Sequence, residues 1–283
     1  MNDRQPFEWI NEESITFLRR GYLSEGEEPL QRIKIIADHA EKILGIDGFS
    51  DKFYGYMSKG WYSLSSPVWA NFGKDRGLPV SCFGSHIADN IESILFTQAE
   101  VGEMSKMGGG TSGYFGNLRG RGADITDNGK APGAVHFMNL FQSVVDNISQ
   151  GSTRRGRFSP YLPIEHPDIM EFLEIGTEGA SIQDLTHAVT VTDEFMESMI
   201  AGDKKKRAAW AKVIQRRGEI GYPYIMFHDT MNKNTVDVYK DKGATINNSN
   251  LCSEIALHNS EEESFVCVLS SMNVLHYDEW RDT

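Results

Sequence analysis

The stretch HAVTVTDEFMESMI, residues 187–200, is typical of a buried strand that runs directly into a helix. HAVTVT is rich in β-branched residues, and DEFMESMI predicts a helix. Upstream, HFMNLFQSVVDNI (residues 136–148) predicts a second, core-facing helix. Its apolar stripe consists of Phe137, Leu140, Phe141, Val144, Val145 and Ile148. Because strands and helices alternate along this part of the chain, we expect an α/β architecture with parallel strands.

The segments before residue 136 extend this pattern toward the N-terminus. Residues 61–72 and 78–88 predict short buried strands, which the polar turn GKDRG separates. A helix is expected to follow, with Asp89 as its N-cap. GGGTSG (residues 108–113) then predicts a glycine-rich loop, which lacks the GK[ST] ending of a phosphate-binding P-loop.

The first part of the chain has a helical period instead. Residues 14–44 predict helices that stop at Gly45, and a further helical patch covers residues 53–59. We therefore expect two regions, an N-terminal helical region (residues 1–60) and an α/β region (residues 61–283).

Composition limits the function classes. The net charge of −12 argues against DNA, another polyanion or an anionic membrane as the main partner. Three cysteines are too few for a disulfide scaffold, and the start MNDRQPFEW contains no leader pattern, so the cytoplasm is the expected compartment. No apolar run approaches the roughly 20 residues needed to cross a bilayer.

The densest group of reactive side chains is Asn250-Leu251-Cys252-Ser253-Glu254, and Cys267 follows fifteen positions after Cys252. In an extended segment Asn250 and Glu254 project to the same side as the Cys252 sulfur. A thiol, an amide and a carboxylate would then face one substrate. A lone cysteine is otherwise a small buried hydrophobe. The wide spacing of the cysteines argues against a zinc site, and no histidine lies in a cysteine-protease signature.

The sequence Asn-Leu-Cys-Ser-Glu-Ile resembles the finger-loop motif of ribonucleotide reductase catalytic subunits. Cys82, after a predicted strand, resembles the first redox cysteine of that family, and Cys267 in CVLSS resembles its partner. The resemblance implies that Cys252 forms a thiyl radical that abstracts the substrate 3′-hydrogen. Glu254 would accept the 3′-hydroxyl proton and Asn250 would hydrogen-bond the substrate hydroxyls. Cys82 would protonate the departing 2′-hydroxyl and then form a disulfide with Cys267.

The same resemblance implies a substrate site and an effector site. The substrate-binding positions are Ser66 (next to Pro67), Ser81, Gly110 and Leu269. The effector-binding positions are Asp89, Arg119, Gln150 and Arg154, which would contact a deoxynucleotide or ATP effector. Around Gln150 the sequence departs from the commoner glycine-rich pattern, because it carries Ser152, Thr153 and the basic Arg155.

For the fold, the resemblance implies a ten-stranded α/β barrel built from two five-stranded halves around a central finger loop. The chain contains the first half, so we expect a second polypeptide or segment to supply the C-terminal portion of the catalytic subunit. Because the sequence begins at the helical region, we do not expect the N-terminal ATP cone that some relatives carry. The expected partners are a homodimer mate, a ribonucleotide substrate and a thioredoxin or glutaredoxin-type reductant.

The form NLCSEI most resembles class I enzymes, which take their radical from a separate metal-containing subunit, so no cofactor or metal is expected in this chain. Two alternatives stay open. One is a class II enzyme that depends on adenosylcobalamin. The other is a non-catalytic nucleotide-binding regulatory fragment.

Overall fold

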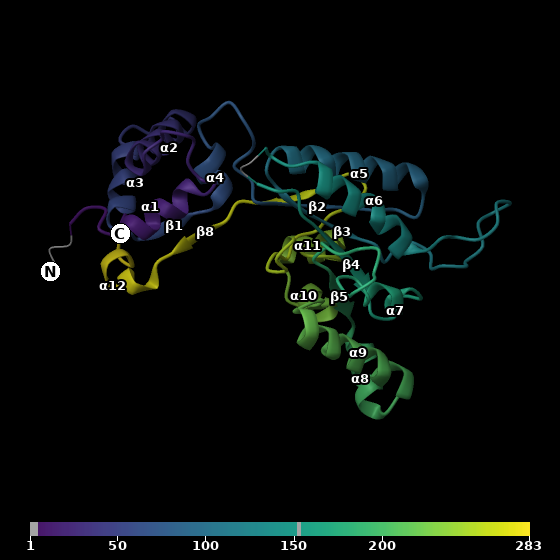
Figure 1. The fold of residues 1–283 in the computed structure, drawn as a ribbon. Coiled ribbons are helices and arrows are strands. Elements are labelled where there is room, and N and C mark those ends of the chain that lie inside the picture. The colour runs from purple at the N-terminus through teal and green to yellow at the C-terminus, as the bar shows by residue number, and fades with distance from the viewer. Residues whose placement is uncertain (1–4, 152–153) are drawn as a thin grey trace.

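The computed structural model of the protein describes residues 5–151 and 154–283 (Figure 1). The helices are α1 (Glu12–Arg19), α2 (Pro29–Leu44), α3 (Phe49–Ser58), α4 (Ser66–Asn71), α5 (Ile91–Lys106), α6 (Ala134–Asn147), α7 (Ile169–Phe172), α8 (Asp193–Ala201), α9 (Lys204–Ile220), α10 (His228–Lys233), α11 (Asp237–Lys242) and α12 (Tyr277–Trp280). The strands are β1 (Tyr62–Leu64), β2 (Cys82–Ser85), β3 (Gly110–Tyr114), β4 (Phe158–Pro163), β5 (Ala188–Val191), β6 (Tyr224–Phe227), β7 (Phe265–Cys267) and β8 (Ser270–Met272). Within these residues no helix has both the length and the apolar character needed to cross a membrane.

Helices α1 to α4 form the N-terminal helical region and share one apolar core. That core contains Leu18, Leu23, Ile33, Ile36, Ala37, Phe53, Met57 and Trp69. Helix α2 ends where the sequence predicts, because Gly45 adopts the left-handed conformation that stops a helix.

The second region is built on a six-stranded sheet in the order β6-β5-β4-β3-β2-β7. Strands β2 to β6 are parallel to their neighbours, and β7 is antiparallel to β2. The predicted strand–helix unit at residues 187–200 is confirmed as β5 followed by α8, with the Thr192 side chain capping the helix. The mixed sheet, which follows the helical region along the chain, forms a half-barrel, as the fold class predicts.

Helices α5 and α6 lie side by side against the sheet (Figure 1). The core between them and the strands is aromatic: Phe141 of α6 stacks on Phe158 of β4 with 4.7 Å between ring centroids. Both side chains are fully buried. This packing fixes β3 and β4, the central strands, which carry residues of the site described below.

The chain after β7 returns to the helical region. Strand β8 pairs with β1 in a small antiparallel sheet, and the Asn273 N–H donates to the Trp61 carbonyl at 2.6 Å. Figure 1 shows this last segment crossing from the barrel sheet to the purple helices. The two regions are therefore joined by two stretches of chain.

Three local predictions were wrong. Residues 66–71 form helix α4 rather than a strand, because Pro67 occupies the first helical turn, a position that proline favours. GGGTSG contains the start of strand β3 rather than only a loop, since its small residues fit a fully buried position between two neighbouring strands. The N-cap of α5 is Asn90, which accepts a hydrogen bond from the Ser93 N–H, and not Asp89.

Candidate active site

The segment that carries Cys252 is a turn, not the extended strand that the sequence suggested. The Ser253 N–H donates to the Asn250 carbonyl at 3.1 Å, and Ser253 has a φ of +66°. The Asn250 side-chain oxygen accepts from the N–H groups of Glu254 at 3.1 Å and Ile255 at 3.2 Å. A short amide side chain that binds nearby backbone groups in this way favours a turn over a strand.

Asn250 connects Cys82, Glu254 and Tyr161 through hydrogen bonds. Its amide nitrogen donates to the Cys82 sulfur at 3.3 Å and to a Glu254 carboxylate oxygen at 2.8 Å. Its backbone carbonyl accepts from the Tyr161 hydroxyl at 2.7 Å. Because Asn250 is fully buried, these contacts hold it in one orientation. The amide and the carboxylate predicted beside Cys252 are thus in contact with each other, and the thiol that the amide contacts is that of Cys82.

Cys82 of β2 lies directly opposite Cys267 of β7 in the antiparallel pair. Both cysteines are buried and reduced. The hydrogen bond between the two thiols, together with burial, raises the pKa of Cys82 far above its usual range, and the same hydrogen bond lowers the pKa of Cys267. The geometry therefore keeps a proton on Cys82 and makes Cys267 the more acidic of the two thiols.

Cys252 differs from this pair because it is exposed. Partial shielding of its sulfur raises the pKa of the thiol, and the nearby Glu254 carboxylate and Cys82 raise it further. Arg154 acts in the opposite direction. The protonated form is the one that can give up a hydrogen atom, so the surroundings of Cys252 suit radical chemistry better than nucleophilic attack, which needs the thiolate.

The predicted substrate-binding positions border this site. The Ser66 hydroxyl, at the start of α4, accepts a hydrogen bond from the Arg154 guanidinium. The Ser81 hydroxyl is buried without a hydrogen-bond partner among the described residues. Gly110 lies beside Cys82, and a Cβ added to it would be 2.7 Å from a methyl carbon of Leu251. Leu269 is 41% exposed, and its carbonyl accepts from the Ser65 N–H.

The predicted effector residues divide into two places. The Arg119 Nε lies 2.7 Å from an Asp89 carboxylate oxygen, and the Arg119 N–H also donates to Asp89 at 3.2 Å. Gln150 is instead buried against Asn71, whereas Arg154 faces Ser66. Ser152 and Thr153, where the sequence departs from the commoner pattern, lie outside the described residues.

Two residues that hold the site in place, Tyr161 and Asn71, were not predicted from the sequence. Tyr161 lies on β4, and its burial raises the pKa of the phenol, so the hydroxyl stays protonated and donates to Asn250. Asn71 binds the loop residue Gln150 from a distance of 79 positions. Neither residue lies in a local motif that could have marked it. Among the described residues, no cluster of histidine, cysteine and acidic side chains is arranged to hold a metal ion.

Comparison with known families agrees with this arrangement. Residues 9–77 match the family "Ribonucleotide reductase, all-alpha domain", and residues 80–207 and 203–282 match "Ribonucleotide reductase, barrel domain". The chain belongs to the ribonucleotide reductase large-subunit family. The half-barrel sheet thus corresponds to the ribonucleotide reductase barrel domain, and the helices that precede it correspond to the all-alpha domain.

Individual relatives support the same assignment. The solved structure of the Actinobacillus ureae class Id ribonucleotide reductase alpha subunit superimposes with a TM-score of 0.93 and 55% sequence identity, covering 99% of this chain and 52% of that one. This likeness places the chain with the class I enzymes rather than with the adenosylcobalamin-dependent alternative.

Two curated relatives are more distant. The ribonucleoside-diphosphate reductase large subunit of Invertebrate iridescent virus 6 is 33% identical over 86% of this chain and 27% of its own length. The Arabidopsis thaliana large subunit is 30% identical over 77% of this chain and 32% of its own length. The chain therefore spans about a third or less of these two relatives.

Proposed function

We propose that this chain supplies the radical and redox residues for reduction of ribonucleotides to 2′-deoxyribonucleotides. The observation that carries the proposal is the Asn250 side chain, which contacts both the Cys82 sulfur and the Glu254 carboxylate. Cys82 in turn lies opposite Cys267. One amide thus links the redox pair to the acid–base residue, and Cys252 lies two positions in sequence from both Asn250 and Glu254.

The radical step would begin at Cys252. As a thiyl, its sulfur takes the 3′-hydrogen of the ribose and becomes a thiol, leaving a carbon radical at C3′. Glu254 accepts the proton of the 3′-hydroxyl, which requires the carboxylate form. At the end of the reaction Glu254 returns the proton to the 3′-oxygen, and Cys252 returns the hydrogen atom to C3′ and is again a thiyl.

The reductive step would use the other two cysteines. Cys82 gives its proton to the 2′-hydroxyl, which leaves as water. The sulfurs of Cys82 and Cys267 together supply two electrons and become a disulfide, while the second thiol proton ends on C2′. The directions of the two pKa shifts suit these roles. The raised pKa of Cys82 keeps its thiol protonated and able to donate to the 2′-hydroxyl, and the lowered pKa of Cys267 lets that thiol lose its proton more readily.

Substrate and effector would bind at different places in the barrel region. Ser66, Ser81, Gly110 and Leu269 would line the substrate site, and Asp89 with Arg119 would contact a deoxynucleotide or ATP effector. Arg154, which contacts Ser66, brings a positive charge to the side where substrate phosphates would lie.

The partners follow from the same proposal. A class I subunit takes its radical from a separate metal-containing subunit, and the C-terminal portion of the catalytic subunit would complete the barrel. A second copy and a thioredoxin or glutaredoxin-type reductant are also proposed. The division into a helical region (residues 1–60) and a barrel region (residues 61–283) stays a prediction.

The test is deoxynucleotide formation by a complex of this chain, a C-terminal barrel segment and a radical-generating subunit. Cys252→Ser should abolish turnover while the complex still assembles. Cys267→Ser should remove reductant-dependent turnover but leave 3′-hydrogen abstraction detectable as isotope exchange. The proposal fails if Cys252→Ser retains activity. A regulatory fragment would instead bind effector and be indifferent to that substitution in every assay.

A further inference from the structure

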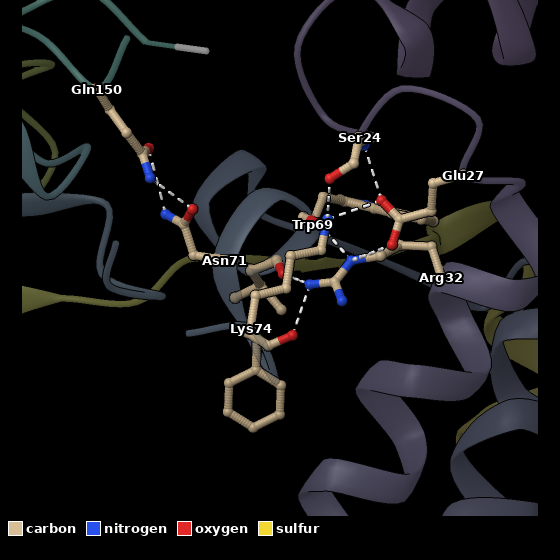
Figure 2. A network of polar contacts seen from close by, with 9 residues as sticks. Ser24, Glu27, Arg32, Trp69, Asn71, Lys74 and Gln150 are labelled. Atoms are coloured by element: carbon tan, nitrogen blue, oxygen red, sulfur yellow. Dashed lines mark hydrogen bonds and ion pairs between the residues drawn. The ribbon is translucent and has the colours of Figure 1, made fainter. Parts of the chain in front are cut away.

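Helix α4 is held at its C-terminal end by a buried guanidinium from the helical region. Arg32 donates to the carbonyls of Trp69 at 2.6 Å, Val68 at 3.1 Å and Phe72 at 2.6 Å (Figure 2). Carbonyls in the last turn of a helix lack partners within the helix, and a cation there also complements the helix dipole. Because Arg32 is fully buried, this contact fixes α4 relative to α2.

The last residue of α4, Asn71, forms a paired amide contact with Gln150. The Gln150 amide nitrogen donates to the Asn71 side-chain oxygen at 2.7 Å, and the Asn71 amide nitrogen approaches the Gln150 oxygen at 3.4 Å. Asn71 also donates to the Leu78 carbonyl at 2.9 Å. Both amides are buried, with Asn71 2% and Gln150 9% exposed. A buried amide pair of this kind is costly to leave unpaired.

Two glycines shape the slot that receives Gln150. A Cβ on Gly77 would lie 2.3 Å from the Gln150 amide nitrogen, and a Cβ on Gly108 would lie 2.2 Å from its oxygen. Both glycines have a positive φ, of +65° and +92°. The slot therefore accepts the Gln150 amide only because no side chain stands at either position.

The same loop contacts the other end of α4. Gln150 and Arg154 face each other in an antiparallel bridge, and the Arg154 side chain donates to Ser66, the first residue of α4. The loop thus forms hydrogen bonds with both ends of helix α4, with Asn71 at its last residue and Ser66 at its first. A shift of Gln150 in its slot would be passed to Arg154 and Ser66.

We infer that Asn71 is a positioning residue that couples the loop at Gln150 and Arg154 to the substrate side of α4. In this state the Gln150 side chain is an anchor, and Arg154 is the loop side chain that faces the substrate. The inference rests on the proposed function, because it assigns Asn71 the transfer of effector state to substrate choice. Asn71 contacts Gln150 and the Leu78 carbonyl, so its assigned role is to position the loop.

The first experiment needs no catalysis. Trypsin cleaves after arginine, and Arg155 and Arg157 are exposed next to the bridge. Asn71→Ala should raise the rate of cleavage at these arginines by about tenfold, because the anchor is lost. Val68→Ala, three positions earlier on α4, weakens the packing of the helix but keeps the amide pair and should leave the rate unchanged. Equal cleavage of the two variants would overturn the inference.

A double-mutant cycle gives a second test. If the amide pair is the anchor, Gln150→Ala should raise cleavage as much as Asn71→Ala, and the double variant no further. Fully additive effects would contradict the coupling. Asn71→Asp keeps the acceptor for Gln150 but removes the donor, so its cleavage rate should fall between those of the native chain and Asn71→Ala.

In the assembled complex, Asn71→Ala should lower the effector-dependent preference between two ribonucleotides several-fold, with effector affinity unchanged. Val68→Ala should keep the preference. An unchanged preference in Asn71→Ala, in a complex that turns over, would overturn the assignment. A complex without any turnover would count against the proposed function, and the cleavage experiments would still decide whether Asn71 anchors the loop.

Discussion

Cys82 and Cys267 lie opposite each other on antiparallel strands β2 and β7, at the edge of a sheet whose other pairings are parallel. Directly opposed residues in such a pair have their Cβ atoms about 4.5–5.5 Å apart, close to the separation that a disulfide requires. Cys252 lies on a separate turn and is exposed, so the two kinds of sulfur chemistry are assigned to different elements.

Mild oxidation with diamide should therefore join Cys82 to Cys267 and leave Cys252 free. Peptide mapping after alkylation of the remaining thiols measures this pairing. Cys252→Ser should give the same disulfide, and Cys267→Ser should leave Cys82 reduced. A bond between Cys82 and Cys252 as the main product would contradict the arrangement.

Gly110→Ala should displace the turn that carries Cys252. The new Cβ would lie 2.7 Å from a Leu251 methyl carbon, and overpacking of this kind costs about 1–3 kcal/mol. We expect a lower urea midpoint and at least a tenfold loss of reductase rate. Gly218→Ala, in α9, meets nothing within 4 Å and should raise stability by about 0.5–1 kcal/mol. Full activity of Gly110→Ala would show that the contact with Leu251 does not position the turn.

The folded chain should lose stability as the pH falls from about 6.5 to 4 because of His187. This side chain is fully buried between the rings of Phe172 and Tyr222, and burial lowers its pKa to about 4. The unfolded chain takes up the proton at higher pH than the folded one, so stability is complete above pH 6.5 and falls through this window.

The expected loss in the free energy of unfolding is roughly 3 kcal/mol, because the pKa of His187 falls from 6.5 to about 4 on folding. His187→Phe should remove this part of the pH dependence in urea unfolding, whereas substitution of the exposed His136 by Phe should not. An identical pH profile for the native chain and His187→Phe would mean that another group causes the loss.

Asp89→Ala should weaken binding of a deoxynucleoside triphosphate. The Asp89 carboxylate orients the Arg119 guanidinium, which also donates to the Asp124 carbonyl at 3.0 Å. Without it the arginine must be ordered by the ligand, and we expect about a tenfold lower affinity by titration calorimetry. The control is Arg121→Ala, since Arg121 pairs with Glu171 instead. Equal losses in both variants would indicate a general charge effect.

The parts of the fold that could be predicted from sequence are those with a local cause. The helix stop at Gly45 and the β5–α8 unit follow from residues adjacent in the chain. The roles predicted for the three cysteines rest on a family motif. The structure places Cys82 opposite Cys267, with Asn250 in contact with Cys82.

The failures have long-range causes. The sequence predicts a loop at β3 because its glycines suggest flexibility, whereas in the fold they allow Leu251 to approach Gly110 from far along the chain. The turn at Cys252 depends on the Asn250 side chain binding its own backbone, which the alternation of side chains in a strand does not consider. The Asn71–Gln150 pair joins two segments with no shared motif.

The position of β7 has a consequence for biosynthesis. During translation β2 to β6 emerge in order, and all four pairings among them join strands that are consecutive in sequence. Cys267 reaches its place beside Cys82 only after all of them, since β7 returns to the strand at which the sheet began. Long-range pairings of this kind are slow to form. Until β7 docks, Cys82 is a lone thiol at an open sheet edge, so a nascent chain is more vulnerable to stray thiol oxidation than the finished fold.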